Sequence, residues 1–215
     1  MNTPADNKNR IAAAAVPIVL IAVSMIAVLA YLMALSNREI NSVTVGYDSI
    51  EVVEDFKPPE KQEVNTEYKK TVQIRNNGTV PCFVRVYVEF SSSAVRECSE
   101  LSCDGGSTFY PADNSSENAF IKNLPDNWVF VSDTSDKLSG YFYYTKPLLT
   151  TGSSVVTAPL FTHVRTTYSD AADITQYDII VYSESVQTIA KNGSDLAASS
   201  SGWREAWNEF LETND

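Results

Sequence analysis

The sequence predicts a mainly β protein in which two antiparallel sheets pack as a sandwich. Short segments that alternate apolar and polar residues recur along the chain, and turn-forming residues separate them. The chain has 215 residues, of which 44% are hydrophobic, and it holds 11 Tyr and 9 Phe. A single domain of this size and composition can bury a substantial core.

The N-terminal segment, residues 1–36, has the pattern of an export signal. Residues 11–35 carry no charged side chain, and Lys8 and Arg10 precede them. Basic residues before an apolar run keep the N-terminus in the cytoplasm and send the rest of the chain across the membrane. The run is long enough for an uncleaved anchor, whereas the small residues at its end suit a signal peptidase. We therefore expect a signal peptide or a signal anchor, followed by an exported domain over residues 37–215.

The first strands of that domain are expected between residues 43 and 90. Residues 43–53 alternate, with a bend near Asp48 where the alternation changes phase. Residues 70–75 and 82–90 alternate again, and the Asn-Asn-Gly-Thr sequence at 76–79 is typical of a tight turn. We therefore expect these two strands to pair as a hairpin. The predicted core face of the second strand comprises Cys82, Val84, Val86, Val88 and Phe90.

A loop insert is expected near residues 91–127, because this stretch is rich in Ser, Asn, Asp and Gly. Strands rich in aromatic and β-branched residues follow it. The run at 177–182 is apolar on both faces, as in a central strand. The other strand segments expected after the insert are 128–131, 140–144 and 153–165, the last of them bent at Pro159.

A short amphipathic helix is expected near residues 202–212. Its apolar residues recur at intervals of three and four, which places them on one helical face. Gly202, with Glu205 three residues later, fits the start of a helix. We expect the apolar face to seal one end or one face of the sandwich. It comprises Trp203, Ala206, Trp207, Phe210 and Leu211.

Charge and residue types argue against an enzyme and against a nucleic-acid-binding protein. The formal net charge is −11, whereas binding to phosphates needs a cationic surface. His163 is the single histidine, and the sequence contains no nucleophile-elbow, phosphate-loop or zinc-binding motif. We therefore expect a non-catalytic protein that holds no cofactor and no metal.

Three cysteines are too few for a disulfide scaffold. Cys98 and Cys103 lie in the polar segment ECSELSCDGG. Outside the cytoplasm they would close a small disulfide loop or remain as two free thiols. Cys82 lies on the apolar face of its strand and is expected to be a buried free thiol.

Several separated segments carry a resemblance to a known family. They are the apolar signal, then SVTVGYDSIEVVEDF, YKKTVQIRNNGTVPCFVRVYVEF, GYFYYTKPLLTTGSSVVTAPLFTHV, YDIIVYSESVQT and a terminal WREAWNEFL. In this order they resemble the TasA/camelysin-type family of exported Gram-positive proteins with SipW-dependent signal peptides. The resemblance covers roughly residues 10–90 and 138–211. It implies a jelly-roll-like or immunoglobulin-like sandwich, processing by the dedicated signal peptidase, and a role in extracellular matrix fibres.

The expected function is therefore that of an exported structural protein, secreted or held at the cell surface. It would self-associate into biofilm matrix fibres or join other matrix proteins, and before processing it would contact the membrane through residues 11–35. One alternative is a membrane-anchored ectodomain for adhesion or ligand binding. Another is a camelysin-like secreted metalloprotease, for which the chain offers no zinc-ligand set.

The segment following the signal is a candidate donor strand for self-association. An unpaired sheet edge accepts an extended segment through main-chain hydrogen bonds, and alternate side chains set the register. The expected apolar anchors are Ile40, Val43, Val45 and Tyr47. The alternative is that this segment forms the first strand within its own subunit. Polymerisation through it is what the family resemblance adds.

Overall fold

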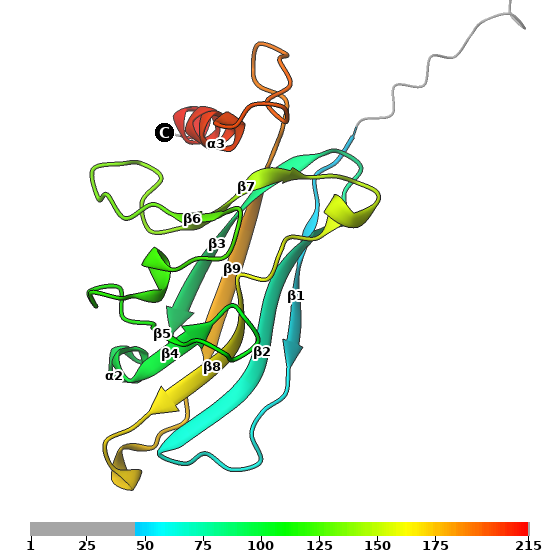
Figure 1. The fold of residues 1–215 in the computed structure, drawn as a ribbon. Helices are drawn as coiled ribbons and strands as arrows, with labels where there is room; N and C mark the ends of the chain where they lie inside the picture. Colours follow the sequence, from blue (N-terminus) through cyan, green and yellow to red (C-terminus); the bar gives the residue numbers. More distant parts are fainter. Residues whose placement is uncertain (1–45, 215) are drawn as a thin grey trace, which may run out of the picture. The chain divides into compact units, whose positions relative to one another are not determined.

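The computed structural model describes residues 46–214, which form two antiparallel sheets and a C-terminal helix (Figure 1). The mainly β sandwich predicted from the sequence is confirmed. The five-stranded sheet has the order β1 (Ile50–Phe56), β2 (Asn65–Asn76), β8 (Phe161–Thr167), β4 (Ser99–Ser102) and β5 (Tyr110–Pro111). The four-stranded sheet has the order β6 (Trp128–Phe130), β7 (Phe142–Leu148), β3 (Cys82–Phe90) and β9 (Ile179–Gln187). The helices are α2 (Ser93–Glu97), η1 (Phe120–Lys122), η2 (Ser153–Val155), η3 (Ala171–Asp173) and α3 (Gly202–Asn214).

The described fold begins at Gly46 and ends with α3. The predicted signal over residues 1–36 lies outside the described residues, as do Ile40, Val43 and Val45. Within residues 46–214, no helix has both the length and the apolar character needed to cross a membrane.

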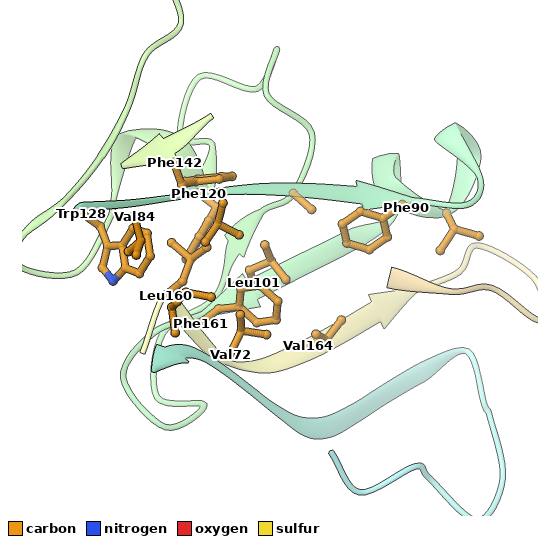
Figure 2. Close-up of a cluster of buried hydrophobic side chains, with 14 of the residues drawn as sticks. Val72, Val84, Phe90, Leu101, Phe120, Trp128, Phe142, Leu160, Phe161 and Val164 are labelled. Atoms are coloured by element: carbon orange, nitrogen blue, oxygen red, sulfur yellow. The ribbon is translucent and has the colours of Figure 1, made fainter. Parts of the chain in front are cut away.

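The main core lies between the two sheets, as Figure 2 shows. Val72 on β2 and Val84 on β3 face this core from opposite sheets, and both side chains are fully buried. The Phe120 ring, carried by η1, packs edge-on against Phe161 of β8 with ring centroids 6.4 Å apart. Burial of such side chains, at about 25 cal/mol per Å² of apolar surface, is the main favourable contribution to folding. The predicted core face of β3 belongs to this cluster and is buried, except that Val88 is half-exposed.

The prediction that β2 and β3 pair as a hairpin is wrong. β2 belongs to the five-stranded sheet and β3 to the four-stranded sheet, so the turn between them crosses the sandwich. The Asn76 side chain supports this crossing, because its Nδ2 donates to the carbonyl oxygens of Val80 and Leu148 at 2.9 and 3.3 Å. Its Oδ1 accepts from the Gly78 N–H at 2.8 Å. An alternating pattern determines which face of a strand is buried, but not which strand lies beside it.

The insert near residues 91–127 is more than the loop that its composition predicts. It contains α2, β4, β5 and η1, and β4 pairs with β8 in the five-stranded sheet. Val95, Leu101 and Phe120 from this stretch are buried in the main core. Isolated apolar residues in a polar sequence show no periodicity, so the sequence pattern does not reveal these elements.

Helix α3 covers part of the outer face of the four-stranded sheet. The ring centroids of Trp203 and Trp207 lie 5.1 and 5.9 Å from that of Tyr143 on β7. The Arg85 guanidinium of β3 lies 4.3 Å from the Trp207 ring centroid. These contacts build a second apolar cluster, which confirms that the helix seals one face of the sandwich. Phe210, also expected on the sealing face, is exposed.

β9 is an edge strand and not the central strand that its apolar sequence predicts. Among the described strands it pairs with β3 alone. Its outer-face residues Ile180 and Tyr182 are 51% and 53% exposed. Strands that are apolar on both faces are normally covered on both. Here α3 covers the outer face only near Val186, which belongs to the second cluster.

Candidate functional site: an exposed sheet edge

Within residues 46–214 the two sheets have four edge strands, and three of them carry features that discourage pairing with another chain. β5 is two residues long and contains Pro111, and β6 is three residues long. β1 carries three acidic side chains, Glu51, Glu54 and Asp55. β9, in contrast, has nine residues and neither Pro nor Lys, and Glu184 is its single charged residue. By these criteria β9 is the least protected edge.

The β9 ladder is regular along its whole length. It pairs with β3 at nine consecutive positions without a register shift, from Ile179 opposite Phe90 to Gln187 opposite Cys82. Cα atoms of β1 approach β9 within 8 Å, yet no main-chain hydrogen bond joins these two strands in the described part of the chain. The outer edge of β9 therefore presents a row of N–H and C=O groups without a partner strand among residues 46–214.

The side chains of β9 leave apolar surface open on both of its faces. Ile179 and Val181 point toward the main core but are only half-buried; of their partners on β3, Phe90 is buried and Val88 is half-buried. Ile180 and Tyr182 point to the outer face and are exposed. An extended segment laid along this edge would gain main-chain hydrogen bonds and would bury alternate apolar side chains.

The residues leading into β1 are anchored to the fold. The Tyr47 N–H donates to Thr79 Oγ1 and the Thr79 N–H donates to the Tyr47 carbonyl oxygen, each at 2.9 Å. The Tyr47 side chain is 57% exposed. Of the predicted donor anchors, Tyr47 is therefore tied by its backbone to its own subunit, whereas Ile40, Val43 and Val45 lie outside the described residues.

Cys82 is a buried free thiol, as predicted. Burial raises the pKa of this thiol far above its ordinary value, and the nearby Asp48 carboxylate raises it further. A thiol with a raised pKa is a poor nucleophile and a poor metal ligand. Asp48 itself lines a hollow of about 360 Å³ between the end of β9 and α3, together with Gln187 and Phe210.

Of the two alternatives for Cys98 and Cys103, a disulfide or two free thiols, the structure has two free thiols. The strand β4 lies between them, so five steps of about 3.3 Å place their Cα atoms on the order of 16 Å apart. A disulfide needs Cα atoms within about 7 Å. The Cys98 thiol donates to the Val95 carbonyl oxygen at 3.3 Å, and Cys103 lies near the Asn123 carbonyl oxygen instead. Burial raises the pKa of both thiols.

No three His, Cys, Asp or Glu side chains within residues 46–214 gather in an arrangement that could hold a metal ion. His163 lies half-buried on β8 opposite Lys69, with its Nδ1 3.2 Å from Thr162 Oγ1. In the described part, the feature with the clearest capacity for binding is thus the open edge of β9. The sequence pattern does not reveal this edge, because the position of a strand within a sheet is a property of the topology.

The fold and this edge define the protein as an antiparallel β-sandwich with a C-terminal covering helix and one unprotected edge strand. Comparisons with protein-family models and with curated proteins find no match to this chain.

Proposed function

We propose that this protein is an exported, non-catalytic structural subunit that assembles into extracellular matrix fibres. In finer detail, its sandwich is of the jelly-roll-like or immunoglobulin-like type, as in the TasA/camelysin-type proteins that its sequence resembles. The observation that carries the proposal is the unprotected β9 edge. Long, regular edges without Pro, Lys or a bulge are rare in proteins that remain monomeric, because such edges template association.

The partner of this edge is the segment preceding Tyr47 in a second copy of the chain. Residues 40–45 read INSVTV, an alternating stretch with Ile40, Val43 and Val45 as apolar positions. Laid along β9, this segment would add a fifth strand to the four-stranded sheet and would cover Ile179 and Val181. A donor segment and an acceptor edge on different parts of one subunit make a head-to-tail contact. Contacts of this kind build open filaments, unless the rotation that relates one subunit to the next closes a ring.

Deletion of residues 37–45 from the mature protein is expected to abolish fibres and leave a folded monomer. The deleted residues precede the Tyr47–Thr79 hydrogen bonds, so β1 and the core keep their contacts. Electron microscopy and size-exclusion chromatography measure assembly, and thermal melting measures the fold. Loss of the cooperative thermal unfolding transition in the deletion variant would show that the segment is a strand of its own subunit.

A matched pair of substitutions tests the acceptor side. Val181→Lys places a charge at a half-buried position on the core side of the edge, beside the donor, so fibre formation should be lost, and thermal melting shows whether the fold is kept. Ile180→Lys, one residue away on the outer face, should still form fibres. Equal assembly by both variants would exclude β9 as the acceptor edge.

Processing of the signal provides a separate test. Small residues end the apolar run and polar Asn37 follows, so the mature chain is expected to begin between about Tyr31 and Arg38. N-terminal sequencing of secreted material measures this position. Full-length chain in the membrane fraction of a host with the dedicated peptidase would instead favour the anchored ectodomain.

A further inference from the structure

A mostly apolar cavity of about 150 Å³ lies beside the C-terminal half of β3. β7 begins at Phe142, opposite Val86, so residues Tyr87–Phe90 of β3 pair only with β9 in the described fold. Figure 2 shows Phe90 at the end of β3, apart from Phe120 and Phe142. The insert supplies further walls through α2, β4 and η1. The apolar side chains that line the cavity include Phe90, Leu101, Phe120, Phe130 and Phe142.

Arg96 on α2 is a charged residue that lines this cavity, and its guanidinium has no partner within residues 46–214. Its Nε is buried without a hydrogen bond, and no ion pair joins its side chain to an acid in that range. The other arginines that are not exposed, Arg85, Arg165 and Arg204, each pair with a carboxylate. A guanidinium keeps its charge at physiological pH, and a partly buried charge without a partner is costly. An anion that reaches Arg96 is therefore bound favourably.

Asp113 is close enough to feel the charge of Arg96, but its carboxylate is engaged by Ser115. Asp113 Oδ1 accepts from the Ser115 N–H at 3.1 Å, and Oδ2 accepts from the Ser115 hydroxyl at 2.5 Å. These hydrogen bonds lower the pKa of Asp113 more than the charge of Arg96 does. The guanidinium donors of Arg96 therefore stay available to a ligand in the cavity.

We propose that this cavity binds a small monocarboxylate whose apolar body is about the size of a phenyl ring. Apolar cavities of this volume take up benzene-sized groups, and a carboxylate accepts two parallel hydrogen bonds from a guanidinium. A doubly charged phosphate would meet a single cation here. The net charge of −11 repels anions, but salt screens exposed charges beyond about 8 Å, so the adjoining guanidinium dominates. Asn114 also lines the cavity and is exposed, which gives the ligand a way in.

Isothermal titration calorimetry of the full chain with phenylacetate tests the proposal. We expect a Kd of about 1 mM or tighter, as for a ligand of roughly ten non-hydrogen atoms. Two further probes separate the two parts of the ligand. Acetate has the carboxylate without the ring, and 2-phenylethylamine has the ring with a positive charge. Each of them should bind at least about tenfold more weakly than phenylacetate, because each loses one of the two interactions.

A matched pair of variants tests the role of the guanidinium. Arg96→Gln should weaken phenylacetate binding by about tenfold, the scale of a hydrogen bond to a charged group, without lowering the melting temperature. Lys122→Gln removes the same charge from η1 and should bind normally, because Lys122 Nζ donates to the Ser116 and Glu117 carbonyl oxygens.

Three results would overturn the assignment of this cavity. They are no binding of phenylacetate by the folded wild type, equal binding of 2-phenylethylamine, and unchanged binding by Arg96→Gln. None of these outcomes involves residues 37–45 or the β9 edge, so the cavity test and the fibre test succeed or fail separately.

Discussion

Val86→Asp is expected to prevent the sandwich from folding. Val86 lies at the centre of β3, and its side chain is completely buried between the two sheets. A carboxylate there would have no cationic partner and would lose its hydration, a cost of several kcal/mol. Domains of this size are stable by roughly 5–15 kcal/mol, so this single change consumes much or all of that margin. Circular dichroism and thermal melting of the purified variant measure the effect.

Ile180→Asp is the matched control for this substitution. It introduces the same charged group on the neighbouring strand β9, but at a position on the outer face that is half open to solvent. Its melting temperature should stay near that of the wild type. If Val86→Asp melted normally while Ile180→Asp unfolded the protein, the two faces of the four-stranded sheet would be assigned the wrong way round.

Trp207→Ala is expected to destabilise the fold by about 3–5 kcal/mol, as for other buried Trp truncations. For a domain of this size that corresponds to a fall in melting temperature of roughly 10 °C. The Trp207 side chain is fully buried, packs edge-on against Tyr143, and covers the Arg85 guanidinium. Removal of the Trp207 side chain opens a cavity and exposes the Arg85 guanidinium, which α3 shields in the wild type.

The control for Trp207→Ala lies at the next position of the same helix. Asn208 is exposed, and Asn208→Ala should change the free energy of unfolding by less than about 0.5 kcal/mol. Equal melting of the Trp207 and Asn208 variants would mean that α3 does not contribute to the stability of the sandwich. Chemical denaturation of both variants gives the two free energies directly.

The strand β3 shows what a sequence pattern can predict. Its alternation is unbroken, and the structure assigns the strand to the predicted residues, Cys82–Phe90. The same alternation did not predict which strands lie beside β3, because it carries no information about the order of strands in a sheet. β2 and β3 were expected side by side, yet their apolar faces meet across the core from different sheets.

Arg85 and β9 show why the site was harder to predict than the fold. The sequence pattern assigns Arg85 to a polar face, but α3 covers that face and Glu184 pairs with the guanidinium. With Ile180 and Tyr182, the β9 sequence is apolar on both faces and predicts a central strand, although β9 lies at a sheet edge in the described fold. Both properties depend on contacts between segments far apart in the chain, which local periodicity does not encode. The proposed donor segment, in contrast, rests on a pattern that is local in sequence.

The neighbours of β3 also determine when this domain can fold. Tyr143 and Glu184, which flank Arg85 in the same sheet, lie 58 and 99 residues further along the chain. During synthesis β3 therefore remains without its two neighbouring strands until β7 and then β9 have been made, so its main-chain edges stay unpaired in the meantime. Contacts over such separations close slowly, typically in milliseconds to seconds, and the waiting strand is prone to pair with other chains. The late arrival of β9 and α3 thus sets the period during which the nascent chain is vulnerable to misassembly.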